Sequence, residues 1–127
     1  MREIIKTDKA PAAVGPYSQA VKVKAADMIF CSGQIPLDPR TGEVVGETAA
    51  EQTRQVMTNL KNILEAAGSD MSRVTKMTIF VLNMDDFGAV NEVYTTFFRS
   101  DPPARATIEA RRLPKDVMIE IDAIALA

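Results

Sequence analysis

Two charged side chains near the C-terminal end have the right types for chemistry on a small organic acid. Arg105 opens a segment of alternating character, and Glu120 lies between two isoleucines. The planar guanidinium of arginine binds a carboxylate through two parallel hydrogen bonds, and a carboxylate on an apolar strand can position water or move protons. We expect the two segments to form a β-hairpin, with strands from Arg105 and from Val117 joined by a turn at 113–116.

The composition narrows the chemistry that such a site can use. The 127 residues contain no histidine and one cysteine, Cys31. Ser–His pairs, Cys–His pairs and histidine-based zinc sites are therefore unavailable, and we expect no metal. An intrachain disulfide is also excluded. Catalysis would have to use carboxylates, Arg, Lys, Tyr, hydroxyl groups, the one thiol or the backbone. We expect Cys31 to be a small buried apolar residue.

Length and charge indicate one domain spanning 1–127 in a cytoplasmic protein. The net charge of −2, with acidic and basic residues mixed along the chain, gives no electrostatic argument for nucleic acid or an anionic membrane. No apolar run approaches the roughly 18 residues that span a bilayer. The first residues lack the apolar core of a signal peptide.

Two helices are predicted by capping residues and by apolar spacing. The first covers 48–67, where Thr48 and Glu51 form a capping box and Gly68 follows the last turn. The second covers 86–99 and ends before two consecutive prolines.

The remaining segments are predicted to be strands. Segments 17–24 and 28–34 are expected to pair as a hairpin, and 74–82 lies between the helices. With the C-terminal pair, the order ββ-α-β-α-ββ indicates an α+β fold, a mixed sheet with two helices packed on one face.

One face of this predicted sheet is left open to solvent and mixes apolar with charged residues. From 117 to 125, alternate positions are uniformly apolar and should face the helices, whereas the other positions include Glu120. A sheet face of such mixed character is usually covered by another chain. We therefore expect a homo-oligomer, with Glu120 at the subunit contact and with Arg105, Thr107, Glu109 and Arg111 on the same open side.

The sequence also resembles a known family along its whole length. The chain is similar to the RidA/YjgF family of reactive-intermediate deaminases. The resemblance is carried by A-P-A-A-V-G-P-Y-S-Q at 10–19, S-G-Q-I-P at 32–36, D-P-R-T-G-E at 38–43, F-x-x-V-N-x-x-Y at 87–94, P-A-R at 103–105 and R-L-P-K-D-V-M-I-E-I at 112–121.

The resemblance implies a fold, an assembly and an activity. The fold would be chorismate-mutase-like, assembled as a homotrimeric barrel with clefts between subunits. The activity would be cofactor-independent hydrolysis of 2-imino and 2-enamino acids to 2-keto acids and ammonia. Substrates would be 2-aminoacrylate with its tautomer 2-iminopropanoate, and 2-iminobutanoate. Such small acids, rather than nucleic acid or membrane, would be the partners.

The same resemblance assigns roles to particular residues. Arg105 would bind the substrate carboxylate, and Glu120 would orient the attacking water and shuttle protons. The remaining substrate-binding residues would be Tyr17, Ser32, Gly33, Asn91 and Thr107. Several family members carry a cysteine at the position of Thr107, so thiol chemistry there is excluded in this chain.

Other interpretations of the same residues stay open. Glu120 could be an interface ion-pair partner, Tyr17 a packing residue, Gly33 a tight strand end and Asn91 a solvent-facing side chain. A non-catalytic trimer that binds keto acids as a regulator would use Arg105 equally well. RNA cleavage with inhibition of translation has been linked to the family, but the net charge of −2 counts against it. A mutase acting on chorismate is suggested by fold alone.

Overall fold

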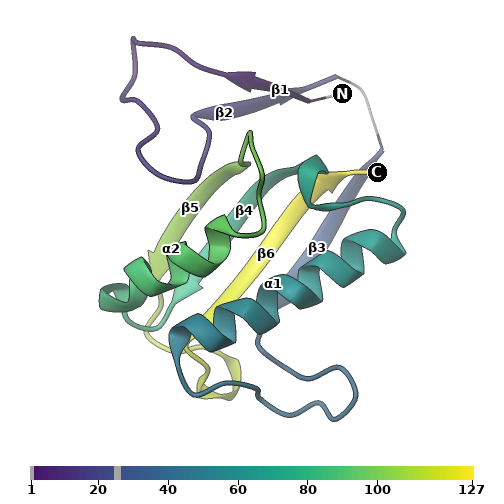
Figure 1. The fold of residues 1–127 in the computed structure, drawn as a ribbon, viewed down its shortest axis with the longest axis vertical. Helices are drawn as coiled ribbons and strands as arrows, with labels where there is room; N and C mark the ends of the chain where they lie inside the picture. The colour runs from purple at the N-terminus through teal and green to yellow at the C-terminus, as the bar shows by residue number, and fades with distance from the viewer. Residues whose placement is uncertain (1, 25–26) are drawn as a thin grey trace.

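A four-stranded mixed sheet carries both helices on one face (Figure 1). The computed structural model describes residues 2–24 and 27–127. The strands lie in the order β3 (Met28–Gln34), β6 (Ile119–Leu126), β4 (Val74–Val81) and β5 (Ala104–Glu109). Strand β4 runs parallel to β5, and β6 runs antiparallel to both β3 and β4. This arrangement confirms the predicted α+β class.

Helix α1 (Ala49–Ala66) confirms the first predicted helix. The Thr48 hydroxyl accepts a hydrogen bond from the Glu51 N–H at 3.2 Å and donates to the Glu51 carboxylate at 3.1 Å. This pair satisfies one of the N–H groups that a helix start leaves free. The apolar stripe of the helix faces the sheet, and Leu60 and Leu64 are fully buried.

Helix α2 (Phe87–Thr95) is shorter than the predicted 86–99. A short 3-10 turn, Met84–Asp86, precedes it, capped by the Asn83 side chain. Beyond Thr95 the N–H groups of Phe97 and Phe98 bond three residues back, at 3.1 and 3.2 Å, so the chain tightens into 3-10 geometry. The apolar stripe continues through this turn because both phenylalanines still pack on the core, which explains the overestimated length.

The alternation predicted along the last strand is confirmed. In β6, Ile119, Ile121 and Ala123 are at most 1% exposed and lie on the helix side of the sheet. Their partners on β4 are Val81, Ile79 and Met77, which are fully buried. The core therefore lies between this sheet face and the two helices, and the buried Cys31 belongs to it as expected.

The predicted hairpin between the Arg105 and Val117 segments is wrong. Strand β4 lies between β5 and β6, and β5 pairs with it in parallel. The chain crosses the end of β4, where the Ala110 N–H bonds to the Val81 carbonyl at 2.8 Å and the Leu82 N–H to the Met118 carbonyl at 3.0 Å. Strand β4 is apolar on both faces, and such a strand takes the central position in a sheet. The alternating pattern of β5 and β6 does not show which strands they pair with.

The predicted hairpin between 17–24 and 28–34 is also wrong. Strand β2 (Ala20–Val23) pairs with β1 (Arg2–Ile5) in a separate two-stranded sheet, and β3 pairs with β6. Part of the connection that we expected at 25–27 lies outside the described residues. Alternating apolar and polar residues in a short segment predict that it is a strand. They do not predict its partner, because another strand can pair with either edge.

The N-terminal arm, residues 2–24, lies at one end of the sheet, beside the segment that leads into β5 (Figure 1). The Ser18 N–H donates to the Pro103 carbonyl at 3.1 Å, and the Ser18 hydroxyl donates to the Pro102 carbonyl. The Arg2 guanidinium donates to the carbonyls of Val74 and Asp101, at 3.0 and 2.6 Å. These contacts bring the loop before β2 to the start of β5.

The observed register changes which face Arg105 occupies. Arg105 aligns with the buried Met77, so it lies on the helix side of the sheet, and Thr107 and Glu109 follow it on that side. Glu120 aligns with Phe80 on the open side. The expectation that Arg105, Thr107 and Glu109 share the open side with Glu120 is therefore wrong, because a strand assigned to the wrong partner and register exchanges its two faces. Arg111 lies beyond the end of β5.

Candidate functional site

Arg105 is a half-buried cation without an acidic partner among residues 2–24 and 27–127. The ion pairs in that part of the chain are Arg40–Asp38, Lys61–Glu65 and Arg112–Asp116. Nη1 of Arg105 donates to Oδ1 of Asn91 at 2.6 Å, and this is its one side-chain hydrogen bond to the described residues. A guanidinium has five N–H donors, so most of the donors of Arg105 remain available to a ligand.

Three aromatic rings surround the guanidinium. Its central carbon lies 5.5 Å from the ring centre of Tyr17, 5.3 Å from that of Phe87 and 5.1 Å from that of Tyr94. Each distance is within the roughly 6 Å range of a cation–π interaction. The rings restrict the position of the guanidinium and partly exclude water from it.

The spacing of residues on α2 explains how this environment forms. Phe87, Asn91 and Tyr94 are separated by four and three residues, so they lie on one face of the helix, directed at the β5 edge of the sheet. Phe87 and Tyr94 provide two of the rings, and Asn91 provides the hydrogen-bond acceptor.

Burial affects the protonation of both Arg105 and Tyr94. Burial lowers the pKa of Arg105, while the neighbouring Tyr94 and Tyr17 raise it in part. Arginine stays charged even so. Burial raises the pKa of Tyr94, and the positive charge of Arg105 opposes that increase. The site therefore combines a permanent, partly dehydrated positive charge with a phenol that stays neutral, which favours an anionic ligand.

The arm contributes its loop and Tyr17 to the same place. The Tyr17 hydroxyl accepts a hydrogen bond from the Val14 N–H at 3.3 Å, and the Tyr17 N–H bonds to the Gly15 carbonyl at 2.9 Å. Gly15 has φ +118°, a conformation that favours glycine. A Cβ at Gly15 would lie 3.9 Å from Nη2 of Arg105, so the loop tip comes close to the guanidinium.

A second group of predicted site residues lies on the open face. Gly33 sits at a register shift in β3, and a Cβ built on it would be 2.2 Å from Oε2 of Glu120. A side chain there would displace the Glu120 carboxylate, so the glycine allows Glu120 to lie across β3. Ser32 is the exposed residue before it. A close approach of a side chain therefore explains Gly33, rather than a tight strand end.

The structure thus divides the predicted site residues into two sets. Arg105, Asn91 and Tyr17 come together, with Thr107 two residues along β5 on the same side of the sheet. Ser32, Gly33 and Glu120 lie on the other side. Phe87, Tyr94 and Gly15 were not predicted as site residues. The signal for Phe87 and Tyr94 is the 87–94 motif, and the signal for Gly15 is the 10–19 motif.

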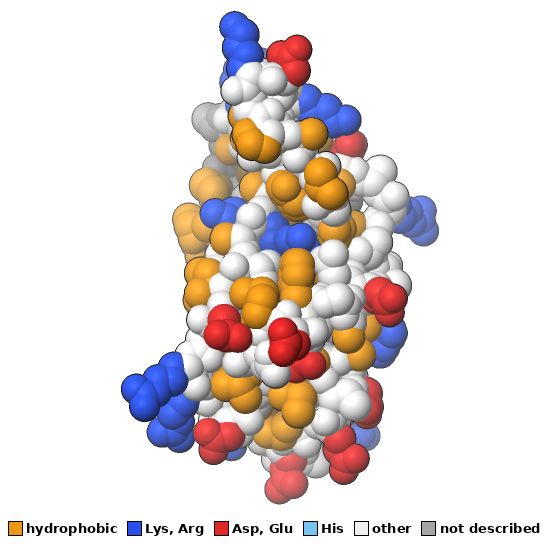
Figure 2. Space-filling model, turned by 90° about the vertical axis from the view of Figure 1, so that its left-hand side faces the viewer, with side chains coloured by type: hydrophobic (Ala, Val, Ile, Leu, Met, Phe, Trp, Pro, Cys, Tyr) orange, Lys and Arg blue, Asp and Glu red, His pale blue; other side chains and the backbone are white. Residues whose placement is uncertain are grey.

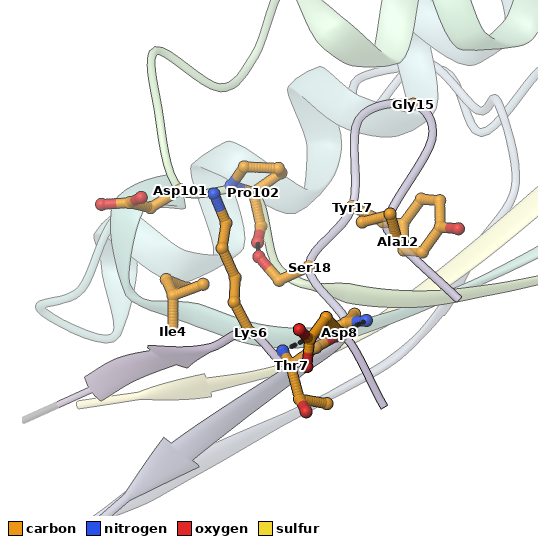
Figure 3. Close-up of a pocket in the computed structure, with 12 residues that line it drawn as sticks. Ile4, Lys6, Thr7, Asp8, Ala12, Gly15, Tyr17, Ser18, Asp101 and Pro102 are labelled. Carbon is orange, nitrogen blue, oxygen red and sulfur yellow. Dashed lines mark hydrogen bonds between the residues drawn. The ribbon is translucent and has the colours of Figure 1, made fainter. Parts of the chain in front are cut away.

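The surface near this site is concave and chemically mixed. Figure 2 views the side of β5 and α2 and shows hydrophobic side chains around basic groups, with acidic side chains below them. A cavity of about 590 Å³ lies between the arm and the segment before β5, and Figure 3 shows the residues that line it. Gly15 and Tyr17 line this cavity and also contact Arg105, although Arg105 does not line it. Gly15 and Tyr17 therefore belong both to the cavity lining and to the surroundings of Arg105.

The described part of the chain contains neither a candidate metal site nor a candidate membrane-spanning helix. No group of three or more His, Cys, Asp or Glu side chains is placed there to hold a metal ion. No helix in residues 2–24 and 27–127 is both long enough and apolar enough to cross a membrane.

Comparison with known proteins decides the family. Residues 7–127 match the family described as Endoribonuclease L-PSP. RutC family protein PH0854 of Pyrococcus horikoshii is 52% identical over 125 residues, covering 98% of each chain. The 2-iminobutanoate/2-iminopropanoate deaminase of Mus musculus is 47% identical over 126 residues, covering 99% of this chain and 92% of the mouse protein.

The chain belongs to the RidA/YjgF family. Solved structures of family members agree with its fold. RidA from Psychrobacter sp. PAMC 21119 superposes with a TM-score of 0.77 at 40% identity, covering 98% of this chain and 99% of that one. E. coli TdcF, solved with bound serine, superposes with a TM-score of 0.76 at 43% identity, covering 98% of both chains. The α+β fold of this RidA/YjgF member is thus shared with its relatives.

Proposed function

We propose that this protein hydrolyses 2-imino and 2-enamino acids to 2-keto acids and ammonia, at sites between the subunits of a homotrimer. The observation that carries the proposal is Arg105, a half-buried cation enclosed by three rings and without an acidic partner in the described residues. Its free N–H donors match the carboxylate of such a substrate. Asn91 and Tyr17 hold the guanidinium in position for it.

The reaction needs little beyond a fixed geometry and one positioned water. A 2-enamino acid first takes a proton at its terminal carbon, which converts it to the iminium. The oxygen of water then adds to the electrophilic C2 of the iminium, and a base takes the proton that water releases. In the resulting carbinolamine the amino nitrogen takes that proton from the base, the C–N bond breaks and ammonia leaves. The hydroxyl oxygen forms the C=O bond as its own proton passes to the base. Glu120 serves as this base and then as the proton donor, while Arg105 fixes the carboxylate next to the reacting carbon.

Arg105 and Glu120 act on one substrate only if they come from different chains. Within a single chain they lie on opposite sides of the sheet. The open face that carries Glu120 also exposes Phe30 by 70% and Ile108 by 46%. Covering this face with another chain removes apolar surface from water, and it can bring Glu120 to the Arg105 side of a neighbouring subunit.

The other predicted residues complete this inter-subunit site. Thr107 follows Arg105 on the same side of β5, where its hydroxyl can bond the substrate. Ser32 and Gly33 accompany Glu120, with Gly33 making room for the carboxylate. The mouse relative's name specifies this class of reaction, and TdcF was solved with an amino acid bound.

The alternatives are less well supported. The matching family is described as an endoribonuclease. However, RNA binding depends on clustered positive side chains that neutralise the phosphate backbone, and this chain has a net charge of −2. A keto-acid-binding regulator would use Arg105 in the same way but would show no turnover.

A coupled assay tests the proposed reaction directly. A pyridoxal-phosphate lyase generates 2-aminoacrylate, and keto-acid release is followed with and without this protein. Release faster than spontaneous hydrolysis is expected. An unchanged rate together with tight pyruvate binding would instead identify the regulator.

A further inference from the structure

Both tyrosines of the chain contact the Arg105 guanidinium, but their hydroxyl groups differ. The chain contains two tyrosines, Tyr17 and Tyr94. The Tyr17 hydroxyl accepts a hydrogen bond from the Val14 N–H. The Tyr94 hydroxyl has no partner, and it is the one buried side-chain oxygen or nitrogen among residues 2–24 and 27–127 of which this is true.

An unpaired hydroxyl at this depth destabilises the folded protein. Tyr94 is 0% exposed, so bulk water does not satisfy its oxygen. Phenylalanine would fill the same space, stack in the same way on Phe98, whose ring centre lies 4.9 Å away, and avoid that cost. The hydroxyl therefore calls for a partner from outside the described residues, either a bound ligand or a buried water.

The surroundings of Tyr94 identify that partner. Its ring centre lies 5.1 Å from the guanidinium carbon, and its hydroxyl and the Arg105 charge each shift the pKa of the other. A molecule bound to the free donors of Arg105 lies next to this ring. Because burial raises the pKa of Tyr94, the group stays protonated and can act as a donor.

A carboxylate has acceptor capacity for an additional donor. Its two oxygens offer about four lone-pair sites, and a bidentate arginine uses two of them. One remaining site can accept the Tyr94 proton, which completes the hydrogen bonding of both the ligand and the protein.

We propose that the Tyr94 hydroxyl donates a hydrogen bond to the carboxylate of the acid held by Arg105, and so contributes to its recognition. This inference rests on the proposed function, because it names a further contact of the same site. The contact forms at the carboxylate, away from the reacting carbon. It therefore strengthens substrate and transition-state binding alike and acts on KM rather than on kcat.

Tyr94→Phe tests the inference, with Tyr17→Phe as the comparison variant. Titration calorimetry with pyruvate gives Kd, the coupled assay gives kcat and KM, and thermal unfolding without ligand gives the melting temperature. For Tyr94→Phe we expect pyruvate Kd and KM to rise about tenfold, the usual effect of losing a hydrogen bond to a charged group. We expect kcat to change little and the melting temperature to stay the same or rise. Tyr17→Phe removes a hydroxyl that already has an internal partner, so its effect on Kd should be smaller.

Three results would overturn this inference. An unchanged Kd in Tyr94→Phe would assign the hydroxyl to an internal water. A lower melting temperature accompanied by a weaker Kd would indicate a structural role, and equal Kd changes in the two variants would remove the special role of Tyr94. If wild-type protein did not speed keto-acid release in the coupled assay, the proposed function itself would fail, which distinguishes the two cases.

Discussion

At the scale of single residues, Arg105 determines what the site can bind. Its guanidinium is planar, permanently charged and held by Asn91 and three rings. Each of these neighbours is neutral, so none compensates the charge. This arrangement therefore suits a negatively charged ligand.

Arg105→Ala is expected to lower kcat/KM in the deaminase assay by about 10- to 150-fold or more, since a hydrogen bond to a charged group contributes about 1.5–3 kcal/mol. Arg105→Lys should recover little of it, because an ammonium lacks the planar fork. Arg40→Ala is the matched control, since that side chain is 87% exposed and lies outside the site. Wild-type kinetics in Arg105→Ala would refute the assignment.

Glu120→Gln separates an enzyme from a binding protein. The amide keeps the shape of the side chain but cannot accept the proton from water. Turnover should fall by about 10²–10⁴, the usual contribution of general acid–base catalysis, while pyruvate binding at Arg105 persists. If Glu120 is only an interface ion-pair partner, the variant should instead dissociate and lose binding and turnover together. Calorimetry, the coupled assay and a mass measurement on the same sample distinguish these outcomes.

At the scale of secondary-structure elements, the site depends on close packing between strands. Strand β3 crosses beneath Glu120 at Gly33, where a Cβ would also come within 3.3 Å of the Glu120 Cγ. A longer residue at this position must turn the glutamate aside. The position of the carboxylate is therefore set by two strands together.

Gly33→Ala should consequently reproduce much of the Glu120→Gln defect. We expect reduced turnover, retained pyruvate binding and a fold that remains intact, because the displaced group is the end of a flexible side chain. Gly88→Ala is the control, since a Cβ there meets nothing within 4 Å. On helix α2 it should raise stability by about 0.5–1 kcal/mol and leave turnover unchanged. Equal turnover in the two variants would show that Gly33 does not position Glu120.

The elements also show what the sequence could and could not predict. Helix α1 was predictable to within a residue at each end because the Thr48–Glu51 capping box marks its start. The buried face of β6 was predictable because alternation has a period of two. Neighbouring strands were not predictable, because pairing depends on long-range hydrogen bonds that leave no local pattern. That error placed Arg105 on the wrong side of the sheet.

The residues around Arg105 illustrate the same limit within one element. Phe87, Asn91 and Tyr94 have the spacing of one helix face, so their proximity to each other was readable. Their contact with Arg105 was not, because it requires α2 to lie over the edge strand β5. Apolar spacing alone does not distinguish a residue that fills the core from one that lines a site.

At the scale of the whole molecule, the open sheet face exposes apolar surface that the proposed trimer would cover. Phe30 is 70% exposed on the face that also carries Glu120. We expect light scattering at micromolar concentration to give three times the 13.9 kDa chain mass. Phe30→Asp should dissociate the assembly, because it would bury a charge at the contact. A monomeric wild-type protein would contradict the proposed trimer.

The central claim is that one catalytic site combines Arg105 of one chain with Glu120 of another. Mixing the two impaired variants tests it most directly: Arg105→Ala and Glu120→Gln are unfolded together, refolded at equal concentration and measured in the coupled deaminase assay. In a cyclic trimer each interface would take Arg105 from one chain and Glu120 from the next, and in an equal mixture each residue is intact in about half of the chains. About a quarter of the interfaces should then carry both intact residues, which should restore about a quarter of wild-type turnover. Mixed trimers, verified by mass, that are no more active than the average of the two parents would contradict the account.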